Sequence, residues 1–295
     1  MSRRKWIKRT LLSIAFVLAL TAGVSYWAFK GTPEYYQRRA MSEQERADAA
    51  ERARRKIFRT QEWVAQLRAD AQRAVHAAST GAPPPSATTR SSQPFSVSFT
   101  EEELNAGFET WSKAFGWDVR YARYISDPRI VLRKDRLILA GTVPDVGTVA
   151  SFHFEPTIDA QGQLVLTLRR VYAGRLPMPD LMWTSQRERL LSAIRQRLPA
   201  WQRGATMAPN GDPNRDAMMA AASNLLLAVM NDQPGDPSIF VWDPANKAAT
   251  PVRLTEVRLA DEELTLTAEP MTAAEREAML ERIRAPESSA TPLAR

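Results

Sequence analysis

The sequence predicts an α+β fold, with an antiparallel sheet and packed helices, preceded by one transmembrane helix and a helical stalk. Three observations predict it. A long apolar segment stands near the N-terminus, and a segment rich in Ala, Glu and Arg follows it. The remainder groups strand-like and helix-like runs in separate blocks. Such blocks are typical of antiparallel α+β domains, whereas regular alternation of strands and helices is typical of a parallel sheet.

The apolar segment is expected to be a membrane anchor. Residues 11–29 read LLSIAFVLALTAGVSYWAF and carry no formal charge. At about 1.5 Å per residue, a helix of this length nearly matches a hydrocarbon core of about 30 Å. Residues 1–10 contain five Lys and Arg, and such a basic tail stays on the cytoplasmic side. We therefore expect a single pass through a bacterial cytoplasmic membrane, with the N-terminus inside and the domain outside the cytoplasm.

Two alternatives to this topology stay open at the level of sequence. A cleaved signal peptide has the same basic and apolar regions, but Tyr26, Trp27 and Phe29 occupy the place where small residues precede a cleavage site. The opposite orientation is the second alternative, because Arg38 and Arg39 flank the other end of the segment. Aromatic residues suit a membrane interface, which favours a retained anchor.

A charged helical stalk is expected at residues 30–78, which contain no glycine or proline after Pro33. An apolar row with 3-4-3 spacing runs along it: Val64, Leu67, Ala71 and Ala74. The row is too short for a clear coiled coil, so a helix that packs one edge on the domain or membrane is favoured over dimerisation. Residues 79–94 are rich in Pro, Ser and Thr and are expected to form a linker.

Charge and cysteine content exclude several classes of function. Residues 1–80 carry 16 Lys and Arg against 7 Asp and Glu, whereas residues 81–295 carry 24 against 26. The basic character therefore belongs to the segment near the anchor, where it suits anionic headgroups of the bilayer, and no nucleic-acid partner is expected. The chain has no cysteine, which excludes disulfides and thiolate chemistry.

Residues 95–285 are expected to form the extracytoplasmic α+β domain, and residues 286–295 a disordered tail. Thr100 and Glu103 stand in a capping-box arrangement, which predicts a helix that begins at about residue 101. Four apolar residues share one face of this helix: Leu104, Phe108, Trp111 and Phe115.

Alternating apolar residues predict strands on both sides of a helical block. The expected elements are, in order, strands in 129–143, 149–154 and 163–174, helices at 181–198 and 215–230, strands in 238–242 and 250–270, and a helix at 272–283. Residues 130–140 and 257–268 both read as strand, acidic turn and strand. Because any β-hairpin tends towards this pattern, coincidence is favoured over internal duplication.

Part of this domain resembles a known family. The stretches FSVSFTEEELNAGF, DRLILAGTV and LVLTLRRVYAGRLPMPDLMW, within residues 95–185, resemble the YpmS-like family of bacterial membrane-anchored extracytoplasmic proteins. The resemblance implies a single-pass topology and assigns no catalytic residue.

Reactive residues are few. The two histidines, His76 and His153, have no other His or Cys at metal-ligand spacing, so no metal, cofactor or catalytic residue is expected. His153 lies in an alternating run and is expected to be a partly buried strand residue. The acidic clusters 101–103 and 261–263 fall at a helix start and a hairpin turn, where carboxylates are common for structural reasons.

These features favour a non-catalytic module that binds or positions an envelope component, an envelope protein or lipid. An alternative is a carrier or sensor of a lipid or other apolar ligand. Its candidate binding residues are Phe152, Met218, Met219 and Met230. A hydrolase of envelope polymers is a less favoured alternative, because it requires two facing carboxylates in a cleft.

Overall fold

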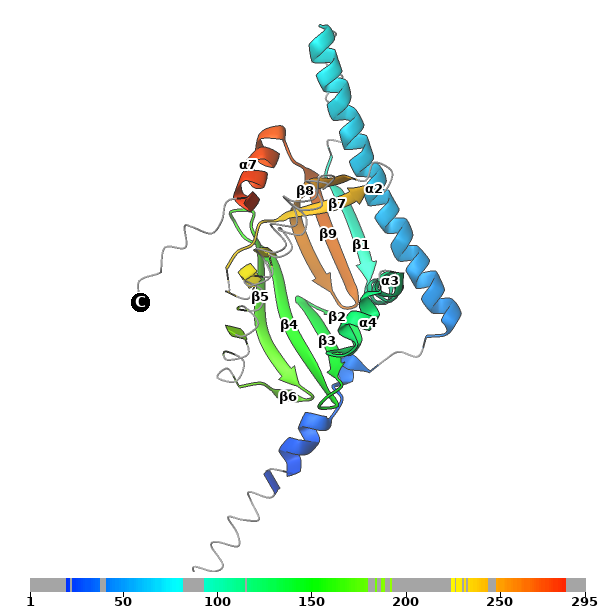
Figure 1. Cartoon of the computed structure of the whole chain (residues 1–295), viewed down its shortest axis with the longest axis vertical. Helices are drawn as coiled ribbons and strands as arrows, with labels where there is room; N and C mark the ends of the chain where they lie inside the picture. The colour runs from blue at the N-terminus through cyan, green and yellow to red at the C-terminus, as the bar shows by residue number, and fades with distance from the viewer. Residues whose placement is uncertain are drawn as a thin grey trace, which may run out of the picture.

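Strands and helices occupy separate blocks of the chain, as expected for an α+β fold (Figure 1). The computed structural model describes residues 20–37 except 22, 41–81, 93–114, 116–179, 233–243 and 248–284, with scattered positions between 184 and 231. The helices are η1 (Glu34–Tyr36, a 3₁₀ turn), α2 (Glu43–Thr80), α3 (Glu101–Ala114), α4 (Trp117–Tyr121) and α7 (Ala273–Arg284). The strands are β1 (Phe95–Thr100), β2 (Ser126–Arg133), β3 (Arg136–Val143), β4 (Thr148–Ile158), β5 (Leu164–Ala173), β6 (Leu176–Pro177), β7 (Ser238–Asp243), β8 (Ala248–Ala260) and β9 (Glu263–Pro270).

The described strands form two antiparallel sheets. One has the order β1-β9-β8-β7 and the other the order β2-β3-β4-β5-β6. The antiparallel α+β prediction is therefore confirmed, and the strand groups fall where alternation placed them. The pairing of β1 with β9 joins segments that are far apart in the chain, with Phe95 opposite Ala268 and Thr100 opposite Glu263.

The two segments with similar sequences both form hairpins. Lys134 and Asp135 connect β2 to β3, and Asp261 and Glu262 connect β8 to β9. In each turn the second residue has a left-handed φ, 59° for Asp135 and 63° for Glu262. The two tips also meet, because the Lys134 amide donates to Asp261 Oδ1 at 3.0 Å and the Glu262 amide donates to the Leu132 carbonyl at 3.3 Å. These bonds join one sheet to the other.

Helix α2 packs along the four-stranded sheet. It begins with a capping box between Ser42 and Glu45 and ends at Gly81, which has a φ of 69°. Trp63 stacks on Phe95 with ring centroids 5.3 Å apart, and Val64 is fully buried in the same cluster. Figure 1 shows the C-terminal part of α2 extending past the sheets, at the end of the molecule opposite the N-terminal helical residues.

Helix α3 begins at the predicted residue. The Thr100 amide donates to Glu103 Oε2 and the Glu103 amide donates to Thr100 Oγ1, which confirms the capping box. The predicted apolar face is wrong for Trp111, which is 49 % exposed. Small and polar residues are buried instead: Glu103, Ala106 and Ser112. The reason is that this helix packs on α2, and a close helix crossing needs small side chains.

Several predicted segments lie wholly or partly outside the described residues. They include residues 1–19, most of the linker, the tail 286–295 and most of the helices at 181–198 and 215–230. Among the residues that are described, no helix is both long and apolar enough to cross a membrane. The short C-terminal helix is confirmed as α7.

Candidate functional site

One face of the five-stranded sheet is covered by the 3₁₀ turn η1. Strand alternation places Arg136, Ile138 and Ala140 of β3 on this face, next to Ser151 and His153 of β4. Tyr36 packs on a buried apolar cluster here: Val131, Ile138, Ala140 and Val149. The turn η1 is therefore part of the core of this sheet.

Two adjacent tyrosines fix η1 to the sheet by hydrogen bonds. The Tyr36 hydroxyl donates to the Asp127 carbonyl at 2.7 Å and lies 3.2 Å from Thr142 Oγ1. The Tyr35 hydroxyl lies 2.7 Å from Ser151 Oγ. Burial raises the pKa of both tyrosine hydroxyls, so these groups remain protonated hydrogen-bonding groups at neutral pH.

His153 stands at the centre of a polar cluster under η1. Its Nε2 lies 3.3 Å from both Ser151 Oγ and the Tyr35 hydroxyl. The centroids of the His153 and Tyr172 rings are 4.7 Å apart. Burial, together with the smaller effects of Arg136 and Arg170, lowers the pKa of His153 to about 4. The imidazole is therefore neutral at physiological pH. Ser151 is fully buried, so its hydroxyl supports the ring and does not face solvent.

A pocket of about 590 Å³ opens beside this cluster. His153, Tyr35 and Tyr172 form its aromatic part. Its charged lining comprises four cationic residues, Arg133, Lys134, Arg136 and Arg175, and two acidic residues, Glu34 and Asp261. The lining thus carries an excess of two positive charges, and the pocket suits an anion.

The four cations differ in how far their charge is already neutralised. Arg133 pairs with Glu101 at 3.2 Å. Arg175 donates from Nε to the Thr32 carbonyl at 3.1 Å and stacks over the Trp27 ring, contacts that leave its charge uncompensated. Among the described residues, neither the Arg136 guanidinium nor the Lys134 ammonium has a hydrogen-bond or ion-pair partner. Three cationic groups are therefore available to a ligand.

The pocket lies where the N-terminal helical residues reach the sheet. Residues 23–30 are helical, and the Phe29 carbonyl accepts a hydrogen bond from Thr148 Oγ1 at 3.2 Å. The Arg175 amide donates to the Ala28 carbonyl at 2.9 Å. Gly174 has a φ of 62° and lies in close contact with the Phe29 carbonyl, where a side chain would collide with backbone. The expected anchor thus leads directly into the pocket wall.

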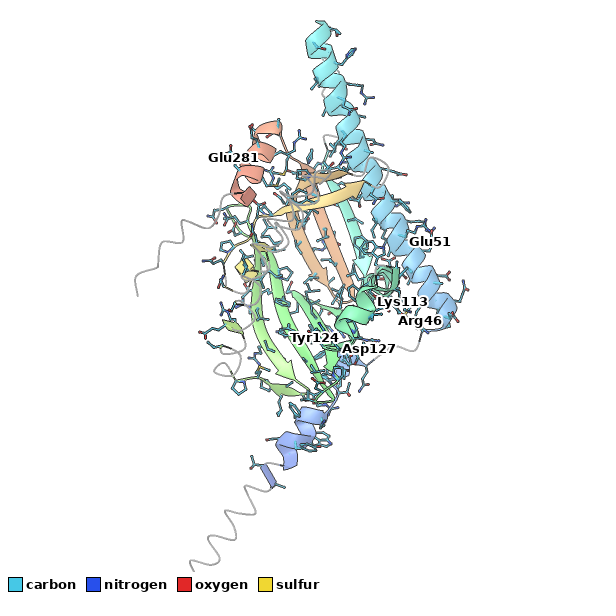
Figure 2. All side chains as sticks on the ribbon, viewed as in Figure 1. Arg46, Glu51, Lys113, Tyr124, Asp127 and Glu281 are labelled. Atoms are coloured by element: carbon cyan, nitrogen blue, oxygen red, sulfur yellow. The ribbon has the colours of Figure 1, made fainter. Side chains whose placement is uncertain are left out.

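A second pocket of about 340 Å³ lies on the other side of η1, between α3 and β2. Arg46 of α2 and Asp127 of β2 both line it (Figure 2). Its carboxylates include members of both acidic clusters noted in the sequence: Glu34, Glu101, Glu102, Glu109, Asp127 and Glu262. Burial raises the pKa of Glu101, although its Oε2 accepts hydrogen bonds from the Leu132 amide at 2.9 Å and from Arg133.

The candidate ligand residues proposed from sequence do not come together in the described structure. Phe152 is the neighbour of His153 in β4, so its side chain points to the opposite face of the sheet. Met218, Met219 and Met230 lie outside the described residues. His153 is a buried strand residue, as expected, but it also lines a pocket.

Sequence reasoning missed the cationic lining. Arg136 is an ordinary strand arginine in the sequence, and only the pairing of β3 with β4 brings it into the pocket that His153 lines. The pairing of β4 with β5 places Arg170, which lies outside the lining, opposite His153. The polar residues Ser151 and His153 within an apolar alternation were the available signal. Comparison with protein-family models, curated proteins and solved structures finds no match to this chain. The resemblance to the YpmS-like family therefore stays a prediction.

Proposed function

We propose that this chain is a single-pass, membrane-anchored extracytoplasmic module that binds or positions an envelope component without converting it. The proposed binding site is the pocket lined by His153, Tyr172 and Arg136. The observation that carries the proposal is the position of this pocket, directly beside the backbone of residues 28–33 that continues the expected anchor.

The chemistry of the pocket supports binding more than conversion. His153 is neutral at physiological pH and buried, and the neighbouring Ser151 hydroxyl is inaccessible. A nucleophile must reach its substrate, and a general base works best with a pKa near the operating pH. The cations and aromatic rings, in contrast, are well suited to hold an anionic group and the body attached to it.

Site-specific photo-crosslinking in cells tests this proposal. The full chain carries p-benzoylphenylalanine in place of Tyr172 or, as a control, in place of Tyr124, which is 58 % exposed and lies outside the pocket (Figure 2). We expect a discrete product with an envelope lipid, polymer or protein from position 172 only. Adding Arg136→Gln should reduce its yield. The same products from both positions, or none from position 172, would overturn the proposal.

One observation favours the hydrolase alternative, namely the second pocket between α3 and β2, which is rich in carboxylates. It places Glu101, whose pKa is raised, in the same cavity as Glu262 and Asp127. A glycosidase needs two carboxyls at its cleavage site, one of which acts as a general acid with a raised pKa. Release of soluble sugar from purified envelope polymers by the full chain, abolished by Glu101→Gln and retained in Lys113→Gln, would favour this function over binding.

A further inference from the structure

We infer that the pocket beside His153 takes a phosphomonoester group, which Arg136, Lys134 and Arg175 hold. This inference rests on the proposed function for the choice of site and adds the chemical class of the ligand. The phosphate could be carried by a lipid headgroup at the membrane surface or by a soluble phosphorylated compound. Both sources share the dianionic phosphoryl group that the pocket recognises.

The charge of the lining favours an anion with several oxygens. Glu101 neutralises Arg133, so among the described residues three unpaired cations remain, Lys134, Arg136 and Arg175, against the acidic lining residues Glu34 and Asp261. A phosphomonoester carries a charge of about −1.5 to −2 at neutral pH and three strong acceptor oxygens. It can therefore accept a charge-assisted bond from each of the three unpaired cations, which a carboxylate with two oxygens cannot do.

The pairing of β2 with β3 brings positively charged side chains together, and among the described residues not all of them have an acidic partner. Arg133 and Arg136 are directly opposite each other at the end of the β2–β3 hairpin, and Lys134 lies in the turn between them. Like charges in directly opposite positions destabilise a sheet. Glu101 neutralises Arg133, but nothing among the described residues neutralises Arg136. A bound dianion would remove this repulsion.

The donors approach from separate segments, which suits an acceptor with several oxygens. Lys134 comes from the β2–β3 turn, Arg136 from β3 and Arg175 from the β5–β6 turn. A phosphoryl group offers three terminal oxygens to such donors, whereas a carboxylate offers two in one plane. The rest of the cavity, lined by Tyr172 and Ile138, leaves room for the group that carries the phosphate.

The electrostatic surroundings of His153 are positive. Among the described residues, the titratable groups that contact His153 or shift its pKa are cationic or neutral: Arg136 from β3, Arg170 and Tyr172 from β5, and Tyr35 from η1. The acidic residues Glu34 and Asp261 line the same pocket. The imidazole itself stays uncharged, because burial and the two arginines lower its pKa to about 4. A bound phosphate would oppose the arginines and raise this pKa, which gives a spectroscopic signature of binding at this site.

Calorimetric titration with inorganic phosphate tests the inference on the full chain in a nonionic detergent. Acetate at the same ionic strength is the comparison ligand. We expect phosphate to bind and acetate to bind at least about tenfold more weakly, because acetate forms fewer charge-assisted bonds. Arg136→Gln should weaken phosphate binding about tenfold or more, and Arg136→Lys should restore part of the loss. Arg258→Gln, which removes an exposed arginine of β8 away from the pocket, should leave it unchanged.

A second readout separates binding at this pocket from binding elsewhere. The chain has only two histidines, so ring signals of labelled histidine are easily assigned with His153→Gln. Phosphate should raise the pKa of His153 and leave His76 unchanged. Equal binding of phosphate and acetate, an unchanged His153 titration, or equal effects of Arg136→Gln and Arg258→Gln would overturn the inference.

Reconstitution distinguishes the two sources of phosphate. The full chain in phosphatidylcholine nanodiscs should bind inorganic phosphate, and added phosphatidic acid should compete with it if the natural source is a lipid headgroup. Undiminished phosphate binding in the presence of phosphatidic acid supports a soluble source. Crosslinking from position 172 without phosphate binding would overturn the ligand class alone. Phosphate binding without crosslinking would overturn the envelope role alone.

Discussion

The ion pair between Glu103 and Lys56 should hold α2 on the rest of the fold. Glu103 is 2 % exposed, and its Oε2 accepts the Lys56 ammonium at 2.6 Å as well as the Thr100 amide at 2.9 Å. Arg52 lies 3.4 Å from the other oxygen. Burial raises the pKa of Glu103, but the Lys56 hydrogen bond and the Thr100 amide outweigh it, so the pKa is lowered below 4.5.

Glu103→Ala should therefore lower the free energy of unfolding by about 2–3 kcal/mol. The lost helix cap contributes about 1 kcal/mol. The lost charge-assisted bond contributes about 1.5 kcal/mol, at the low end of its usual range because the Lys56 side chain remains 30 % exposed to water. The stabilisation by the ionised Glu103 is present above about pH 4.5 and is lost as the pH falls through the lowered pKa.

A double-mutant cycle with Glu103→Gln and Lys56→Met isolates the pair. Urea unfolding of the full chain in nonionic detergent, followed by tryptophan fluorescence, should give a coupling of about 1–2 kcal/mol. The matched control is the exposed pair Glu109–Lys113 on α3, whose coupling should not exceed experimental error. Equal coupling in both pairs would refute the role of Glu103 in holding α2 on the domain.

Four further predictions concern the pocket, the N-terminal segment and the topology. His153→Gln should reduce the loss of stability of the native chain between pH 6.5 and about 4, which amounts to up to about 3 kcal/mol, because the folded state resists protonation of His153 and the unfolded state does not. Urea midpoints measured across this range test it. Gly174→Ala should destabilise more than Gly162→Ala in thermal unfolding, because both glycines have a left-handed φ but only Gly174 lies against the Phe29 carbonyl. Leu18→Arg should shift the chain out of the membrane fraction, because Arg costs about 2.5–3.5 kcal/mol at the centre of a bilayer. Protease added outside spheroplasts should cut the linker at 79–94.

The outcomes that contradict these predictions are specific. If the stability of the native chain and of His153→Gln changed with pH in the same way, burial would not lower the pKa of His153. Equal effects of the two glycine substitutions would mean that residues 28–29 do not dock on the β5–β6 turn. Cleavage of the linker only after the cytoplasmic membrane is broken would reverse the proposed orientation.

The sequence by itself predicted the antiparallel α+β class, the capping box at Thr100 and Glu103, and both hairpins. These features depend on residues close together in the chain, so alternation, turn residues and caps are sufficient to reveal them. The same local patterns wrongly placed Trp111 on the buried face of α3. A helix has several faces, and only the position of α2 decides which of them is buried.

Only the tertiary structure decided the candidate site. Tyr35 belongs to a short turn just after the expected anchor, Arg136 and His153 to different strands, and Arg175 to a later turn. No periodicity links these positions, because their proximity comes from the register of β3, β4 and β5 and from the docking of η1. The sequence alone does not show whether an unpaired arginine faces water or a pocket. The charge of this pocket is thus a property of strand pairing across the sheet, which local sequence patterns do not encode.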